Sequence, residues 1–183
     1  MLDGEEKSII DRAIGGDTLA FGLLYDRYHD QIYRFVYLKV SHREEAEDIT
    51  HHVFLSAWQH MADYKHRGFP FSSLLYQIAR NKVIDHYRTK KSTIDIEGLH
   101  EADIPHHESS LEDAVHFQFQ VATVKDAIKQ LKQDYQDIII MRYIEELSPS
   151  EVARILKKPE TTVRVLQHRA IKQLKAILNK DAQ

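Results

Sequence analysis

Apolar residues recur at spacings of three and four along most of the chain, and this pattern predicts helices. The clearest case is the stretch 148–178, where Ser148 and Glu151 have the spacing of a capping box and Pro149 suits the first helical position. Pro159 ends this short helix, because the residue before a proline is pushed out of the helical conformation. The longer helix that follows carries an apolar stripe of Val163, Leu166, Ala170, Leu174 and Ile177.

The side chains outside this stripe are mostly cationic or able to form hydrogen bonds. A short helix, a turn and a longer basic helix predict a helix-turn-helix, whose second helix contacts base edges and phosphates. The residues expected to face DNA are Thr161, Thr162, Arg164, His168, Arg169 and Lys172. The alternative is an ordinary helical hairpin with a solvated basic face, since runs of charge are often only solvated.

Four further helical segments fill the amino-terminal half, over 3–14, 17–40, 41–62 and 72–91. Asp17 is expected to cap the second segment, and Ser41 with Glu44 forms a second capping box at the start of the third. The second segment has an aromatic-rich face that we expect to pack inside a bundle, formed by Phe21, Leu24, Tyr25, Tyr28, Ile32, Phe35 and Val36. The third segment presents an acidic and histidine-rich face, and the fourth a basic exterior.

The loop over 63–71 mixes aromatic rings with cationic side chains. Such a loop suits unpaired bases, because every base has a face on which a ring can stack and every phosphate has a charge to neutralise. The rings could equally plug the end of a helical bundle. The residues alone leave both interpretations open.

Charge is distributed unevenly along the 183 residues, which changes the meaning of a net charge of −3. Residues 1–91 are balanced, residues 92–121 carry seven acidic and no basic side chains, and residues 122–183 carry twelve basic against eight acidic ones. We therefore expect an all-α protein with two helical domains, 1–91 and 122–183, joined by a flexible acidic linker over 92–121.

Composition narrows the class of protein further. The chain has no cysteine, which excludes disulfides and thiolate metal sites and agrees with a cytoplasmic location. We find no run of about 18 apolar residues and no secretion signal, and therefore expect no membrane insertion.

Three motifs stand in a fixed order along the chain: AEDITHHVFLSAW at 46–58, FPFSSLLYQIARNKVIDHYRTKK at 69–91 and IIIMRYIEELSPSEVARILKKPETTVRVLQHRAIKQL at 138–174. Together they resemble the extracytoplasmic-function group of bacterial sigma factors, in the sigma-70 superfamily, and the resemblance covers nearly the whole chain. It implies a protein that binds RNA polymerase core, reads the minus-thirty-five element of a promoter and melts the minus-ten element. Polymerase would supply the reaction, so the resemblance implies neither enzyme activity nor a cofactor.

The resemblance also assigns roles to surfaces. The helix of the first motif would dock on the clamp helices of the polymerase core (beta and beta-prime subunits), with contacts from Glu45, Asp48, His51, His52 and Leu55. The loop and the next helix would capture an unpaired minus-ten base with Tyr64, Phe71 and Asn81, and bind phosphates with Arg80, Lys82 and Arg88. The helix-turn-helix would read the minus-thirty-five element, and an anti-sigma factor is a further partner that the family implies.

The chain departs from the family pattern at several positions. Leu74 replaces a usual tryptophan, Thr161 a glycine, His51-His52 a glutamine-glutamate pair and Val165-Leu166 a serine-arginine pair. The missing arginine removes a phosphate or base contact, so the promoter of relatives cannot be carried over. Because histidine titrates near neutral pH, the histidine pair could make core docking sensitive to pH.

Two other functions stay open at this point. Glu47 and His51, four residues apart, could ligate zinc, but neither an HExxH pattern nor a third ligand at a fixed spacing accompanies them. A dimeric helix-turn-helix regulator that acts without core polymerase would use the amino-terminal helices to dimerise on a palindrome. Copurification with polymerase core, as opposed to self-association, would distinguish the regulator from a sigma factor.

Overall fold

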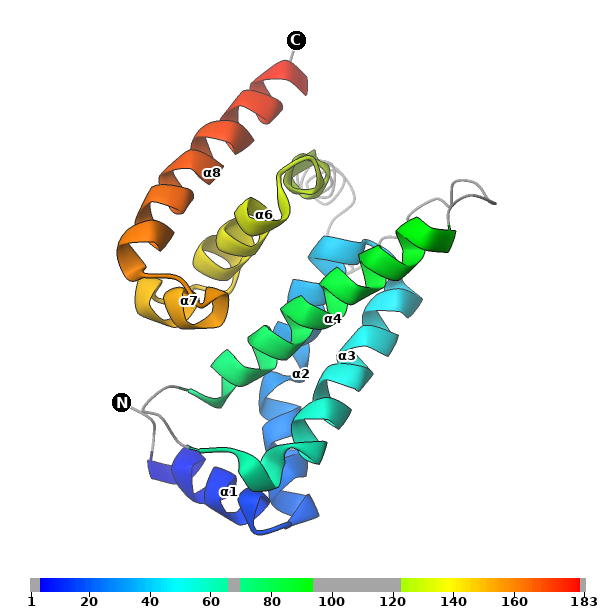
Figure 1. Cartoon of the computed structure of the whole chain (residues 1–183), viewed down its shortest axis with the longest axis vertical. Coiled ribbons are helices and arrows are strands. Elements are labelled where there is room, and N and C mark those ends of the chain that lie inside the picture. The colour runs from blue at the N-terminus through cyan, green and yellow to red at the C-terminus, as the bar shows by residue number, and fades with distance from the viewer. Residues whose placement is uncertain (1–3, 66–69, 94–122, 182–183) are drawn as a thin grey trace, which may run out of the picture. The chain divides into compact units, whose positions relative to one another are not determined.

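The computed structural model describes residues 4–65, 70–93 and 123–181 (Figure 1). Every element in these ranges is a helix, which confirms the predicted fold class. The chain divides into two compact units: residues 1–100 hold the first, and most of residues 101–183 hold the second. The predicted acidic linker lies almost entirely outside the described residues.

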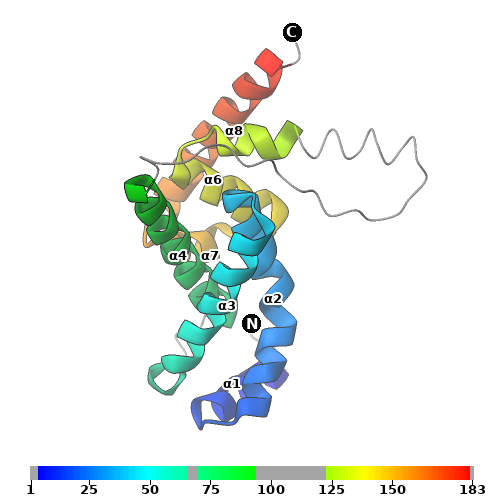
Figure 2. The same cartoon turned by 90° about the vertical axis from the view of Figure 1, so that its right-hand side faces the viewer.

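The first unit is a helical bundle of α1 (Gly4–Ile14), α2 (Thr18–Val40), α3 (Arg43–Gln59), the 3-10 turn η1 (Met61–Asp63) and α4 (Phe71–Thr93). The helices α2, α3 and α4 pack against one another, and α1 lies beside the start of α2 (Figure 2). Three of the four predicted segments agree with these bounds to within about two residues. The third stops earlier than predicted, because the chain tightens into η1 before the loop.

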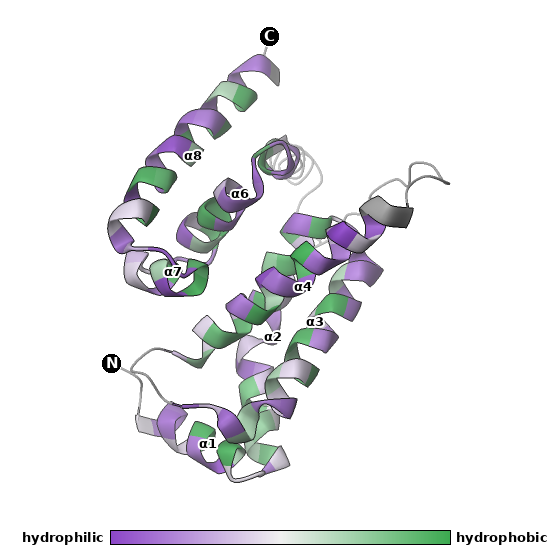
Figure 3. Ribbon diagram, viewed as in Figure 1, coloured by the Kyte–Doolittle hydropathy of each residue, from purple (hydrophilic) through white to green (hydrophobic). Residues whose placement is uncertain are grey.

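Hydrophobic and hydrophilic residues alternate along each helix of this bundle, so that every helix has one apolar side (Figure 3). The apolar sides meet in a core whose fully buried members include Leu24, Ile32, Phe35, Val53, Leu75, Tyr76 and Val83. The rings of Phe35 and Tyr76 meet edge to face with centroids 5.4 Å apart. Burying each such side chain stabilises the bundle by about 1.5–3 kcal/mol, which is why the helices form despite ordinary helix propensities.

The junction between α1 and α2 follows from two residues. Gly16 has a φ of 88°, the left-handed conformation that ends α1 and that glycine adopts without steric cost. Asp17 caps α2 as predicted, because its Oδ1 accepts hydrogen bonds from the backbone N–H groups of Leu19 and Ala20 at 3.0 and 3.1 Å. These backbone hydrogen bonds, with the Arg12 guanidinium beside it, lower the pKa of Asp17 below its ordinary value.

The start of α3 differs from the predicted capping box of Ser41 and Glu44. Ser41 ends α2 in a left-handed conformation with a φ of 58°, and its backbone N–H donates to the Tyr37 carbonyl at 2.8 Å. The cap of α3 is instead His42, whose Nδ1 accepts from the Glu45 backbone N–H at 3.5 Å. The spacing from Ser41 to Glu44 fits a capping box, but the reversal between two antiparallel helices uses Ser41 for the turn and moves the cap by one residue.

In the second unit, residues 123–129 are helical and precede α6 (Gln133–Ile139), which runs into the π-helical turn η2 (Ile140–Ile144). The unit ends with α7 (Pro149–Leu156) and α8 (Glu160–Asp181), and α6 packs against α8 (Figure 1). The apolar stretch over residues 135–143 therefore forms a short α-helix extended by a π-turn.

Both ends of α7 are fixed by local hydrogen bonds. The predicted capping box is present: the Glu151 N–H donates to Ser148 Oγ at 3.3 Å, and the Ser148 N–H donates to Glu151 Oε2 at 2.8 Å. Lys157 ends the helix with a φ of 52°, and the Lys158 N–H donates back to the Ala153 carbonyl at 2.9 Å. Two residues later α8 begins, so α7 and α8 form the predicted helix-turn-helix.

Candidate functional site

The outward face of α3 carries four of the five residues predicted to bind the polymerase core. Asp48, His51, His52 and Leu55 are all exposed there. His52 Nδ1 donates to the Asp48 backbone carbonyl at 2.7 Å, which holds the imidazole against its own helix. These four side chains are accessible to a protein partner.

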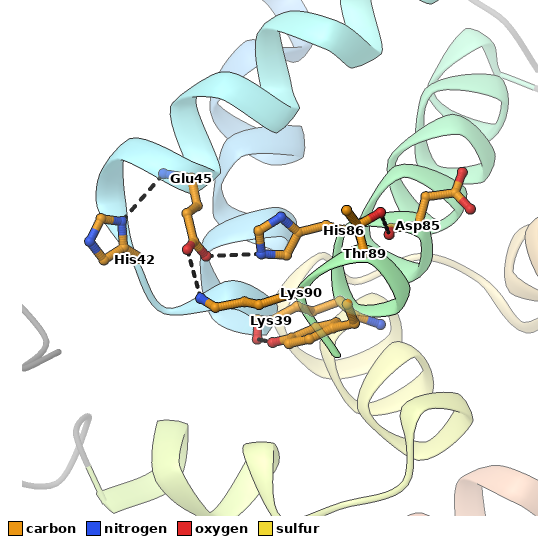
Figure 4. Close-up of polar contacts among 8 residues, drawn as sticks. Lys39, His42, Glu45, Asp85, His86, Thr89 and Lys90 are labelled. Carbon is orange, nitrogen blue, oxygen red and sulfur yellow. Dashed lines mark hydrogen bonds and ion pairs between the residues drawn. The ribbon is translucent and has the colours of Figure 1, made fainter. Parts of the chain in front are cut away.

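Glu45, the fifth predicted contact, points from α3 toward α4 instead (Figure 4). Lys90 Nζ donates to Glu45 Oε1 at 2.7 Å, and His86 Nε2 lies 3.0 Å from Oε2 without the alignment of a hydrogen bond. Burial raises the pKa of Glu45, but the Lys90 hydrogen bond and the charges of His86 and Lys90 outweigh it, so the net shift is downward. Its carboxylate joins two helices of the bundle, and its role as a docking contact stays a prediction.

We expect Glu45→Gln to lower the free energy of unfolding at pH 7 by about 1 kcal/mol, because Lys90 loses its charged partner. A carboxyl group with a lowered folded-state pKa stabilises the fold above its unfolded pKa, near 4.5, and that stabilisation is lost as the pH falls through the folded value. Urea titrations at pH 7 and at pH 3.5 should therefore show the two proteins converging in acid. Asp26→Asn, at an exposed carboxylate of α2, serves as the control and should match wild type at both pH values.

A groove of about 310 Å³ lies between α2 and α3, and it is lined by Thr18, Phe21, Tyr25, His51, Phe54, Leu55 and Trp58. The rings of Phe21 and Trp58 have centroids 4.9 Å apart, and those of Tyr25 and Phe54 4.7 Å. Leu55 is 43% exposed at this groove. The predicted docking residues His51 and Leu55 are thus part of an aromatic surface formed by two helices.

Sequence reasoning missed the contribution of α2, because it assigned Phe21 and Tyr25 to the core. Both are half-exposed, whereas Leu24, Tyr28 and Ile32 of the same helix are buried. The sequence does contain a signal for this surface, because rings recur every fourth residue beside the buried stripe, at Phe21, Tyr25, His29, Tyr33 and Tyr37.

The end of the bundle near η1 holds two of the residues predicted to capture a base. Tyr64 is half-buried, and its ring meets that of Phe71 edge to face with centroids 5.5 Å apart. Phe71, the first residue of α4, is fully buried. Tyr64 packs against it, and the Phe71 ring offers no exposed face on which a base could stack. Phe71 therefore lies in the bundle end, as the alternative interpretation of the loop expects, and its part in base capture stays a prediction. Residues 66–69 of the loop lie outside the described residues.

Tyr28 lies on the other side of Phe71, with ring centroids 6.2 Å apart. Its hydroxyl donates to the carboxylate of Glu6, a buried residue of α1. Burial and this hydrogen bond raise the pKa of Tyr28 well above its ordinary value. The first helix therefore supports the ring cluster on which Tyr64 rests.

The third predicted capture residue, Asn81, lies ten residues beyond Phe71 on α4, or about 15 Å along the helix axis. The structure thus places two of the predicted capture residues at different points of the bundle, Tyr64 beside the start of α4 and Asn81 in the middle of that helix. Asn81 and Arg88 are both exposed and, seven residues apart, share one face of α4. Arg88 pairs with Asp85 at 3.2 Å. The other two predicted phosphate contacts, Arg80 and Lys82, are half-exposed on either side of this face.

The outward face of α8 carries the residues predicted to read DNA. Thr161, Arg164, His168, Arg169 and Lys172 are exposed, and Thr162 is half-exposed. Arg164 pairs with Glu160 one turn earlier at 2.7 Å. On the inward side, Gln167 accepts from Arg142 Nε at 3.3 Å and donates to the Tyr143 hydroxyl at 2.7 Å, so η2 fixes the rotation of α8.

The comparisons with known proteins agree with this division into two helical units. Residues 24–93 match Sigma-70 region 2, and residues 122–174 match Sigma-70 region 4. SigW of Bacillus subtilis, an ECF RNA polymerase sigma factor, is 31% identical over 177 residues, which cover 92% of this chain and 94% of SigW. The chain belongs to the ECF sigma factors.

Two further relatives show how far the likeness extends. BldN of Streptomyces coelicolor is 34% identical over 174 residues, which cover 95% of this sigma factor. The matched residues span only 66% of the length of BldN. The structure of the sigma factor RpoE from Bartonella quintana, in complex with the anti-sigma factor NepR, superposes with a TM-score of 0.68 at 20% identity. It covers 87% of this sigma factor and 96% of that chain, which shows a shared fold.

Two properties of the described residues of this sigma factor bear on the membrane and zinc-site interpretations. Within those ranges, no helix combines the length and the apolar character that crossing a membrane requires. No three histidine, aspartate or glutamate side chains there lie close enough to hold a metal ion. Glu47, the zinc ligand considered above, pairs with Arg43 at 2.8 Å.

Proposed function

We propose that this ECF sigma factor binds RNA polymerase core and directs initiation at specific promoters, by reading the minus-thirty-five element and melting the minus-ten element. The observation that carries the proposal is that one chain combines regions 2 and 4 of the sigma-70 family, each lying mostly in a different helical unit. Polymerase supplies the chemistry. Family membership favours this function over a dimeric regulator that works without polymerase.

We assign core docking to the groove between α2 and α3. Its aromatic rings and Leu55 offer the desolvated apolar centre that protein interfaces use for most of their affinity. Asp48, on the same exposed face of α3, adds negative charge that suits a basic partner surface. Of the predicted contacts we keep Asp48, His51, His52 and Leu55, and we add Phe21, Tyr25 and Trp58.

We assign the melted minus-ten strand to a path along α4 rather than to one pocket. Tyr64 would stack on one unpaired base at the start of the path, and the Asn81 amide would bind the edge of another about 15 Å further on. Arg88, on the same face as Asn81, would then neutralise a phosphate. We assign the minus-thirty-five element to the exposed face of α8.

Transcription in vitro tests the proposal. We would mix purified core polymerase with the full chain and a library of chromosomal promoter fragments, and sequence the 5′ ends of the transcripts. We expect starts at a fixed distance from one shared pair of promoter elements, and none with core alone. Light scattering of the free chain and of the mixture provides a second measurement. A stable dimer that binds DNA and starts no transcription would instead support the regulator.

We infer one further protein partner. RpoE is bound to an anti-sigma factor in its structure, and a protein of that kind would silence this chain by covering the α2–α3 groove or the DNA-binding face of α8. Because its other partners are polymerase and chromosomal DNA, we place the chain in the cytoplasm.

A further inference from the structure

The exposed face of α8 has an apolar residue at its centre. Each residue advances about 100° around an α-helix, so Val165 lies about 200° from Val163, which is fully buried against the rest of its unit. Val165 is accordingly 49% exposed and is the only large hydrophobic residue of α8 exposed to this degree. Val165 is therefore the apolar group at the centre of an otherwise polar face, and the groups around it decide what that face can bind.

The side chains around Val165 indicate what kind of ligand this is. Thr161, His168, Arg169 and Lys172 are its neighbours at helical spacing, and all four are exposed. No acidic side chain occurs between Glu160 and Asp181. A cationic surface without acids suits a polyanion, and one isolated valine is too small an apolar area to hold a protein partner.

Arg164, the residue first expected to read bases, lies at the edge of this face rather than at its centre. It is about 100° around the helix from the buried Val163. Glu160 also holds its guanidinium at 2.7 Å. When α8 enters a major groove with this face foremost, Val165 is therefore directed toward the base edges.

The apolar group that base edges present in the major groove is the 5-methyl group of thymine, and 5-methylcytosine carries the same group at the same place. We propose that Val165 contacts the 5-methyl group of one pyrimidine in the minus-thirty-five element and so selects thymine or 5-methylcytosine over cytosine there. This inference rests on the proposed function, since it requires α8 to read promoter DNA.

Replacing single thymines by deoxyuridine tests the contact, because the substitution removes the methyl group and leaves the base pairing intact. With holoenzyme and a promoter selected from a random minus-thirty-five library, we expect about a fourfold loss of affinity at one thymine, the value of one methyl group withdrawn from water. The loss should disappear in Val165→Ser. In a second arm, 5-methylcytosine at that position should bind about fourfold more tightly than cytosine, again only with Val165 present.

Val124→Ser is the matched control, because Val124 is 40% exposed in the same unit but lies outside α8. It should keep the full effect of deoxyuridine. An equal loss in wild type and Val165→Ser at every thymine, or no loss at any, would overturn the contact while leaving promoter selection intact. A Val165→Ser variant that loses affinity for core rather than for DNA would overturn it in favour of a protein partner. Failure of the holoenzyme to select any minus-thirty-five sequence would instead reject the proposed function itself.

Discussion

Leu55→Glu is expected to weaken binding to RNA polymerase core by about 100-fold, or about 2.7 kcal/mol. Leu55 stands at the groove between α2 and α3, where aromatic side chains from both helices are half-exposed. A carboxylate placed there must lose its water when a partner covers the groove. Fluorescence anisotropy of the labelled chain, titrated with core, measures the change.

Leu23→Glu provides a close control. Leu23 is 49% exposed against 43% for Leu55, and it lies on α2 but outside the groove. Both variants add the same charge to an exposed leucine of the same bundle, so both should keep the wild-type circular dichroism and melting temperature. If Leu55→Glu binds core as tightly as Leu23→Glu does, the groove is not the docking surface.

The groove also shows where a periodic pattern stops being informative. Helical spacing correctly placed Leu24, Ile32 and Phe35 in the core, because a stripe with three- and four-residue spacing must face the other helices. It could not separate Phe21 and Tyr25 from that stripe. Aromatic residues one position away from a buried stripe lie at its border, and only the packing of the neighbouring helix decides whether they are covered.

The same limit applies to charged side chains. The sequence places Glu45 with Asp48 and His52 at three- and four-residue spacing on α3, but it carries no information on which helix lies next to that face. Lys90, forty-five residues further along the chain, approaches from α4 and binds the Glu45 carboxylate, which therefore points toward that helix. The pH sensitivity of core docking suggested for His51 and His52 stays a prediction. The structure places His51 in the lining of the groove to which we assign docking.

Helix caps, which depend only on nearby residues, were predicted more reliably from the sequence than contacts between helices were. Asp17 and the pair of Ser148 and Glu151 form the caps that their spacing predicts, because a cap depends on residues within one turn. Ser41 was misassigned because the same residue also fits the left-handed end of α2. The distance from Phe71 to Asn81 was available from the helix rise alone, and it favours two separate contacts over a single base pocket.

The path along α4 leads to the second large effect. Opening a duplex costs on the order of 1.4 kcal/mol per base-pair step, so the protein must offer an unpaired base a contact that duplex DNA lacks. Ring stacking supplies about 1–3 kcal/mol per base. We expect Tyr64→Ala and Asn81→Ala each to lower the yield of open complex on duplex promoters about tenfold or more, while sparing core binding and closed-complex formation. Permanganate reactivity of unpaired thymines measures the yield.

Tyr64 precedes α4 and packs on Phe71 at its start, whereas Asn81 lies about 15 Å from Phe71 along the helix axis, so the two residues should contact different bases, and this makes the two variants distinguishable. Removing the base opposite Tyr64 from the strand should abolish the difference between wild type and Tyr64→Ala but leave the Asn81→Ala defect intact. Removing the base opposite Asn81, one or more nucleotides away, should do the reverse.

A template already melted at the minus-ten element should rescue each variant only in part, since the lost contact to the captured base is still missing. Tyr64→Phe keeps the ring and its packing on Phe71 and should melt promoters almost normally, while Asp26→Ala, at an exposed residue of α2, should behave as wild type. Normal thymine reactivity in both alanine variants would show that Tyr64 only closes the end of the bundle, and that the single strand follows another route.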